Sequence, residues 1–235
     1  MSAFRRTSGL ACLTLALLCL VGCDEMTDDP SLLEGPRILA VKMEPRILTP
    51  GVEHTLTALT HDLGAVTWNA CITPFIPDAD LTCPVPIPND PLQAVEPTLS
   101  LPLFIPEGIP VTDLWLKLSS SDTAVLPGVF RIGQATGDEN PSVTAVSDPD
   151  GNPITTLQVG SSTSITPTVL DPLETNRLTI SYFTTHGSFA SHRTLDGNPS
   201  VFEAPAEPAT VEWTIIVRDG EEGVGWGRFQ VEVVE

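Results

Sequence analysis

The chain has 235 residues, and its 30 acidic residues against 11 lysines and arginines give a formal net charge of −19. A surface this acidic repels nucleic acid and anionic lipid, which excludes nucleic acid as a partner. The same charge would attract divalent cations or a basic partner, although solubility is its simplest explanation. Because proline breaks helix interiors, the 23 prolines exclude a mainly helical fold. Frequent valine, isoleucine and threonine instead predict an all-β protein.

The start of the chain has the pattern of a secretory signal. Arg5 and Arg6 precede an apolar run, residues 10–21, that carries no charge. The run is shorter than the roughly 20 apolar residues that a transmembrane helix needs. It also lacks the small-residue A-x-A-like site of an ordinary cleaved signal and ends instead in Leu20-Val21-Gly22-Cys23.

These last four residues resemble the lipobox of bacterial lipoproteins. In that family the signal is removed before the cysteine, the thiol receives a diacylglyceryl group and the new amine is acylated, a palmitate-type modification. The resemblance implies removal of residues 1–22 and lipid attachment at Cys23, since two or more acyl chains anchor a protein stably. The alternative is a plain secretory peptide. We expect the outer membrane; the inner membrane is the alternative, because Asp24 tends to retain lipoproteins there in enteric bacteria.

Two cysteines remain for the folded part. Of the five in the chain, two leave with the signal and Cys23 carries the lipid, which leaves Cys71 and Cys83. Two thiols in an exported protein most simply pair, and closing so short a loop would stabilise the fold by about 3 kcal/mol. A metal site would need further ligands, and no histidine lies between them. We predict a structural disulfide that clips the proline-rich residues 74–91 to their strand.

The mature chain divides into a tether, two domains and a linker. Residues 23–35 are acidic after the lipidated cysteine and lack periodicity, which predicts a flexible tether. Alternation of apolar and polar residues predicts short strands over 36–136 and again over 143–235, joined by a polar linker at 137–142. Several short strands at this spacing, separated by turn signals, predict two β-sandwiches.

The two halves resemble immunoglobulin-like or PKD-like repeats of secreted bacterial proteins. The first half carries Val66-Thr67-Trp68, a core tryptophan on the third strand. The second carries WTIIVRDG (213–220) followed by GVGW (223–226), as the last hairpin of such repeats commonly reads. As a whole the chain resembles two-domain lipoproteins of Gram-negative bacteria whose function is mostly unassigned. The cysteine pair that joins the sheets of antibody domains is missing, so an antibody-type core is not implied.

No common catalytic motif occurs in the sequence, neither a nucleophile elbow nor a zincin helix nor a phosphate loop. The strongest enzyme-like cluster is His186, His192 and Asp196, which could bind zinc or act with Ser188 or Ser191. Two histidines six residues apart across a glycine turn are far more often surface residues. We therefore predict no catalytic site.

Three oxygen-bearing side chains, Asp148, Asp150 and Asn152, fall within five residues, and calcium prefers oxygen ligands. The remaining spacing of an EF-hand loop is missing, and Asp-Gly and Asn-Pro are ordinary turn dipeptides. We predict a turn, with Ca²⁺ as the weaker alternative and no other cofactor. The acidic hairpin at 219–222 has the same two interpretations.

Trp115 and Trp226 fall outside the predicted core faces. Exposed aromatic rings can stack on sugars or anchor a protein partner, but they can equally pack between two domains, which we favour. Taken together, the sequence predicts a lipid-anchored, non-catalytic binding or scaffolding protein of the cell envelope, with an unknown protein or glycan partner. One alternative is a carbohydrate-binding accessory protein, which needs a row of exposed aromatics. A weaker one is a hydrolase that uses the region of His186 and His192.

Overall fold

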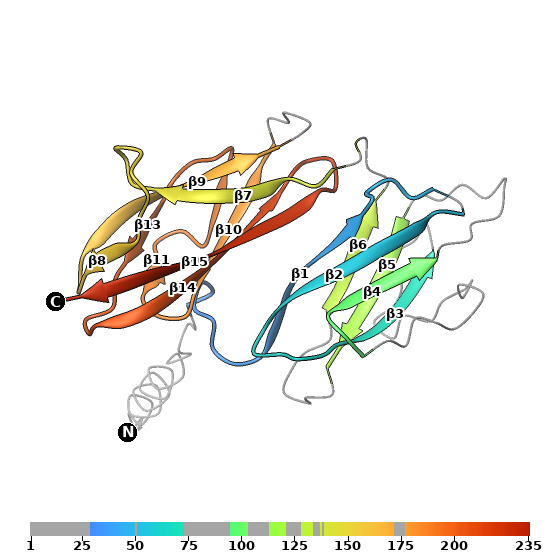
Figure 1. The fold of residues 1–235 in the computed structure, drawn as a ribbon, viewed down its shortest axis with the longest axis horizontal. Helices are drawn as coiled ribbons and strands as arrows, with labels where there is room; N and C mark the ends of the chain where they lie inside the picture. The colour runs from blue at the N-terminus through green and yellow to red at the C-terminus, as the bar shows by residue number, and fades with distance from the viewer. Residues whose placement is uncertain are drawn as a thin grey trace, which may run out of the picture.

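The computed structural model describes residues 29–49, 51–72, 95–102, 113–120, 128–133, 137, 139–171 and 177–235 (Figure 1). Every regular element in these ranges is a β-strand, which confirms the all-β prediction. A helix with the length and apolar character of a membrane span is not found in the described ranges. The signal, Cys23 and Cys83 lie outside them, so lipid attachment and the disulfide stay predictions.

The N-terminal sandwich consists of two three-stranded antiparallel sheets, ordered β1-β2-β4 and β3-β5-β6. Its strands are β1 (Arg37–Glu44), β2 (Glu53–His61), β3 (Thr67–Ile72), β4 (Thr98–Pro102), β5 (Asp113–Ser119) and β6 (Gly128–Gly133). The core between the sheets follows the predicted period of two: Leu114, Leu116 and Leu118 are fully buried. Trp68 is also fully buried, and its indole Nε1 donates to Glu96 O (2.7 Å).

The C-terminal sandwich is larger, with a four-stranded sheet ordered β11-β13-β9-β7 and a five-stranded sheet ordered β12-β10-β14-β15-β8. Its strands are β7 (Ser142–Ser147), β8 (Thr156–Gln158), β9 (Ser162–Leu170), β10 (Thr179–Thr184), β11 (Ser188–Phe189), β12 (Arg193–Leu195), β13 (Ser200–Glu203), β14 (Ala209–Arg218) and β15 (Val224–Val234). Only β8 runs parallel to its neighbour, β15; the other named pairs are antiparallel.

An aromatic cluster fills the centre of the C-terminal core. Phe189 contacts Tyr182 and Phe202 with ring centroids 5.1 Å apart, and Phe202 meets Trp213 edge-on at 4.9 Å. Tilted and edge-on pairs at these distances add to the stability gained by burying the rings. Trp213 is fully buried, as the alternation along its strand predicts.

Both sandwiches have the same connectivity. In each, the first, second and fourth main strands form one sheet (β1, β2, β4 and β7, β9, β13), and the third, fifth and sixth form the other (β3, β5, β6 and β10, β14, β15). These are the ABE and CFG sheets of an immunoglobulin domain, and Trp68 lies on the strand equivalent to C, where that fold buries a tryptophan. The predicted fold class, two tandem immunoglobulin-like sandwiches, is confirmed.

The first described residues correct the predicted tether. Ser31 and Leu33 are buried, and backbone hydrogen bonds join Ser31 and Leu33 to Thr184 of β10. The prediction of a flexible tether up to residue 35 is therefore wrong for residues 29–33. The physical reason is that these residues supply hydrogen-bond partners to the end of a buried strand, which an acidic, aperiodic sequence does not reveal.

Candidate functional site

The best-defined polar site in the described residues is the junction between the two sandwiches. Arg46 follows β1, and its side chain is 2% exposed. Its Nη1 lies 3.1 Å from Oδ2 of Asp219, whose side chain is fully buried after β14. The same guanidinium donates to Glu139 O (2.7 Å) and Glu221 O (2.6 Å). One side chain of the N-terminal sandwich thus holds the linker and the last hairpin of the C-terminal sandwich together.

The turn that carries Arg46 is itself held on both sides. Before it, Nδ1 of the buried His54 on β2 donates to Pro45 O (2.9 Å). After it, Leu48 is buried in the core of the N-terminal sandwich. These contacts aim the guanidinium at the neighbouring domain.

On the other side of the junction, the acidic hairpin wraps its own backbone around Asp219. Oδ1 accepts from Glu221 N (2.9 Å) and Gly223 N (2.6 Å). A Cβ on Gly223 would lie 2.2 Å from Asp219 Oδ2 and 2.7 Å from Arg46 Cζ, so only glycine fits beside the ion pair. The carboxylate therefore bonds to Arg46 and to the backbone of its own hairpin.

Asn140 adds a second polar link across the junction. Its Nδ2 donates to Met43 O (2.8 Å) on β1, and its Oδ1 accepts from Val224 N (3.1 Å) on β15. The linker at 137–142 therefore carries a side chain that bonds to both sandwiches. A residue in this position resists sliding of one sandwich against the other.

An apolar cluster completes the junction. Ala40 of β1, Leu59 of β2 and Ile216 of β14 are buried together, and the half-buried Trp226 of β15 packs against them. Lys42 Nζ lies 5.2 Å from the centroid of the Trp226 ring, within the range of a cation–π contact. Figure 1 shows β1 beside β14 and β15, so the outer faces of two sheets meet here.

The burial of the junction has electrostatic consequences. Removing one partner of a buried ion pair costs roughly 3–5 kcal/mol, because the other charge is left without compensation. Arg218 is the last residue of β14. Burial of its guanidinium lowers the pKa of Arg218, and the nearby charge of Arg193 lowers it further. The exposed ion pair Arg131–Glu222 (3.2 Å) lies at the rim of the junction. The arrangement can fix the two sandwiches relative to each other, because the charges of Arg46 and Asp219 pair across the junction.

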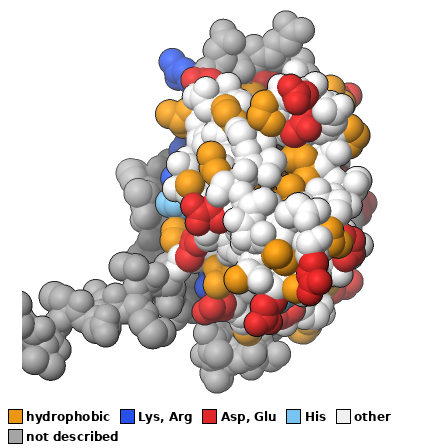
Figure 2. Space-filling view, turned by 90° about the vertical axis from the view of Figure 1, so that its left-hand side faces the viewer, with side chains coloured by type: hydrophobic (Ala, Val, Ile, Leu, Met, Phe, Trp, Pro, Cys, Tyr) orange, Lys and Arg blue, Asp and Glu red, His pale blue; other side chains and the backbone are white. Residues whose placement is uncertain are grey.

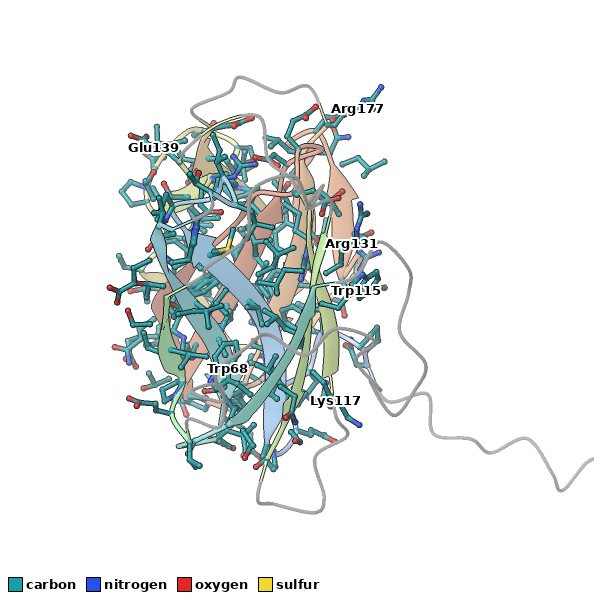
Figure 3. All side chains as sticks on the ribbon, turned by 90° about the vertical axis from the view of Figure 1, so that its right-hand side faces the viewer. Trp68, Trp115, Lys117, Arg131, Glu139 and Arg177 are labelled. Atoms are coloured by element: carbon teal, nitrogen blue, oxygen red, sulfur yellow. The ribbon has the colours of Figure 1, made fainter. Side chains whose placement is uncertain are left out.

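The two tryptophans singled out from the sequence lie in different places. Trp226 belongs to the junction, as described above. Trp115 is half-buried on the outer face of β5, paired across to Arg131 of β6 and two residues from Lys117, along one side of the N-terminal sandwich (Figure 3). Its indole Nε1 is buried and has no hydrogen-bond partner among the described residues. Among the described residues, no aromatic side chain is exposed.

The residues of the enzyme-like cluster remain surface residues. His186 and His192 are exposed, before β11 and before β12, and Asp196 is exposed in a turn with φ 54°. His186 Nδ1 lies 3.2 Å from Thr185 Oγ1. Within the described parts of the chain, no three His, Cys, Asp or Glu side chains gather in a way that could hold a metal ion. The structure does not bring the proposed cluster together.

The calcium candidate is a hydrogen-bonded turn. Asp148 Oδ1 accepts from the backbone N–H groups of Asp150 (2.9 Å) and Asn152 (2.8 Å), and the Asn152 side chain also bonds to Asp148. These bonds, that from the Asn152 backbone above all, lower the pKa of Asp148. Both carboxylate oxygens of Asp148 thus accept hydrogen bonds within the turn.

The predicted disulfide falls partly within the described residues. Cys71 lies on β3 in register with Trp115 of β5. Cys83 lies outside the described ranges, so the pairing of the two thiols stays a prediction.

Fold and junction define the molecule as a tandem immunoglobulin-like protein with a buried, polar interdomain contact. No protein-family model matches the chain, and no curated protein matches it. Among solved structures it is similar to the D00-D0 domain of intimin (11% identity, 83% of this chain and 100% of that chain, TM-score 0.30). It is also similar to fibronectin(III)-like modules of Clostridium thermocellum CbhA (14%, 83% and 93%, TM-score 0.30). Murine CEACAM1b is a further similar structure (13%, 83% and 100%, TM-score 0.26).

Sequence reasoning missed Arg46 and Asn140, and it considered Asp219 only as part of an acidic hairpin, because no local pattern marks a contact between residues 173 positions apart. One signal was present. The run Ile215-Ile216-Val217 is apolar on both faces of β14, which is typical of a strand covered on both sides. In the structure all three residues are fully buried, two in the core and Ile216 in the junction.

Proposed function

We propose that the chain is a non-catalytic envelope protein, anchored by lipid at Cys23, whose two immunoglobulin-like sandwiches act as one rigid binding or scaffolding unit. The observation that carries this proposal is the junction. A buried ion pair, a bridging asparagine and an apolar cluster connect the sandwiches. The lipid anchor is supported by the resemblance of Leu20-Val21-Gly22-Cys23 to a lipobox.

The polar groups of the described residues favour a non-catalytic role. Asp219 pairs with Arg46, and Asp148 accepts hydrogen bonds from its own turn. His54 donates to the backbone of the loop that carries Arg46. The two surface histidines lack a partner cluster in the described ranges. Catalysis needs a nucleophile or base oriented by a second group, whereas Asp219, Asp148 and His54 are oriented toward structural contacts.

A carbohydrate-binding role is the alternative, and it receives less support. Stacking on sugar rings needs exposed aromatic faces, whereas Trp226 is packed in the junction and Trp115 is half-buried. A glycan array with the wild-type protein and Trp115→Ala separates the two. Binding that depends on Trp115 would favour the carbohydrate role, and no glycan binding is the result we expect.

Mass spectrometry of the native protein tests the anchor. We expect a chain that begins at Cys23 and carries acyl groups on both its thiol and its amine. Cys23→Ser should move the protein from the membrane to the soluble fraction. The matched control Cys19→Ser lies in the apolar run, outside the lipobox-like residues, and should leave the protein on the membrane. An unacylated amino terminus, or a Cys23→Ser protein that still pellets with membranes, contradicts the anchor.

A further inference from the structure

Residues 29–33, the first that the structure describes, form an N-terminal arm. The arm packs against the C-terminal sandwich, although the N-terminal sandwich is the one that follows it in the sequence. The chain enters the N-terminal sandwich directly after the arm, yet the arm lies beside β10 of the C-terminal sandwich (Figure 1). Leu32 pairs in parallel with Thr184. Thr184 N donates to Ser31 O (2.8 Å), and Leu33 N donates to Thr184 O (2.7 Å).

The C-terminal sandwich needs this arm. Thr184 is fully buried and pairs with β14 on one side, but β12 pairs with β10 only from Thr179 to Ser181 on the other. The arm takes the open position beyond the end of β12. It also brings Ser31 Oγ to accept from the buried Phe189 N (3.1 Å). Without the arm, backbone groups of Thr184 and Phe189 would lose their partners, which buried groups rarely tolerate.

Asp29 holds the start of the described arm. Its Oδ1 accepts from both the backbone N (2.8 Å) and the Oγ (2.7 Å) of Ser31, and its carbonyl accepts from Leu32 N (2.9 Å). Ser31 is fully buried and Leu33 is 5% exposed. Side-chain contacts and burial therefore hold the arm in addition to its backbone hydrogen bonds.

From these contacts we infer that the arm makes the C-terminal sandwich the membrane-proximal one and leaves the N-terminal sandwich projecting away. This inference rests on the proposed lipid at Cys23. Cys23 and Asp29 are six residues apart in sequence, and an extended chain spans at most about 3.6 Å per residue, so the lipid lies within about 20 Å of the arm. A tether free to Gly35 would reach about twice as far, enough for either sandwich to face the bilayer.

Charge does not produce this orientation by itself. Figure 2 shows the end of the C-terminal sandwich that looks away from its neighbour, with many acidic side chains spread over it. An acidic surface is repelled by anionic lipid head groups. The C-terminal sandwich is therefore held near the membrane by its covalent connection and the arm, and its acidic surface favours a water-filled gap.

The test supplies the anchor chemically. The amino-terminal cysteine of a chain that begins at Cys23 is joined to a phospholipid by cyanobenzothiazole condensation, which leaves internal thiols unmodified. The product is placed in phosphatidylcholine vesicles that contain a rhodamine-lipid acceptor. A donor dye is attached to a bio-orthogonal amino acid at Glu207 of the C-terminal sandwich or Asn69 of the N-terminal one, both exposed. We expect several-fold stronger quenching at 207. Because the anchor does not come from the cell, this result is independent of the mass-spectrometry test of lipidation.

Two variants separate the arm from the anchor. Ser31→Gly with Leu33→Asp should free the arm and shrink the difference between the two donors, whereas the exposed neighbour Glu34→Gln should preserve it. If the double variant does not fold, a flexible glycine-serine insertion between Thr27 and Asp28 leaves the arm intact and should reduce quenching at 207. Equal quenching at both positions in the unmodified protein, or stronger quenching at 69, overturns the inference. So does an insertion that leaves quenching at 207 unchanged.

Discussion

The two sandwiches share one connectivity and use the same sheet in opposite ways. On β10-β14-β15 the outer face is covered by the neighbouring domain, with Ile216 fully buried and Trp226 packed against it. On the equivalent β3-β5-β6 the outer face carries Trp115 and Lys117, neither of them fully buried. The inward residues of such a sheet set the fold, so its outward residues are free to be adapted to a junction or to another surface.

The largest loss of stability is expected from disrupting the buried ion pair of the junction. Arg46→Met leaves Asp219 buried without a counter-charge, and we expect the free energy of unfolding to fall by about 3–5 kcal/mol in denaturant titrations. Arg131→Met removes one partner of the exposed pair with Glu222 and should cost at most about 1 kcal/mol. Adding Asp219→Asn to Arg46→Met removes the uncompensated charge and keeps Oδ1 as the acceptor for Glu221 N and Gly223 N, so it should recover much of the loss. Equal effects of the two arginine substitutions would contradict a structural role for the pair.

Next in size is the apolar part of the junction. Ile216→Ala removes buried methyl groups and leaves a cavity, which should lower the free energy of unfolding by about 2–5 kcal/mol. The matched substitution Lys117→Ala on the equivalent strand β5, where the side chain is only half-buried, should cost less, about 1 kcal/mol. Thermal denaturation followed by circular dichroism measures both. A larger effect at Lys117 would show that the two outer faces are not used as described.

A smaller effect is expected at Gly223. Gly223→Ala introduces a Cβ against the Asp219 carboxylate and the Arg46 guanidinium, and relieving this overlap should cost about 1–3 kcal/mol. Gly64 has open space around the position of a Cβ and provides the control. Comparison of Gly223→Ala and Gly64→Ala by denaturant titration shows whether the junction is as tightly packed as its distances imply. Similar stability of the two variants would contradict that packing.

The smallest effect concerns pH at the turn of Asp148. Hydrogen bonds in the folded state lower its pKa, so the carboxylate contributes stability above its unfolded pKa of about 3.9, and this contribution is lost as pH falls through the lower folded value. Asp148→Asn should therefore be slightly less stable than the wild type near neutral pH and should approach it below about pH 4. Unfolding midpoints across this pH range measure the convergence. A constant difference at every pH would contradict the assignment.

Strand alternation made much of the fold predictable. The spacing of Leu114, Leu116 and Leu118 alone predicts a strand with one buried face. The alternation of Trp213 with Val211 and Ile215 predicts the same for its strand. The junction was not predictable in this way, because Arg46 and Asp219 come from distant turns whose sequences show only local turn chemistry. The contact of the N-terminal arm with β10 was not predictable for a related reason. Its partner is the end of a strand whose open backbone groups depend on where β12 stops, and sequence does not give that boundary.

The junction also constrains how the protein can be made. Arg46 precedes Asp219 by 173 positions, and Ser31 precedes Phe189 by 158. During synthesis from the amino terminus, the first sandwich therefore emerges with an apolar strip around Ala40 and Leu59 that stays uncovered until almost the whole chain is complete. Such a strip on a nascent domain is a site where a chaperone would be needed, and a truncated chain that ends before β14 would carry it permanently.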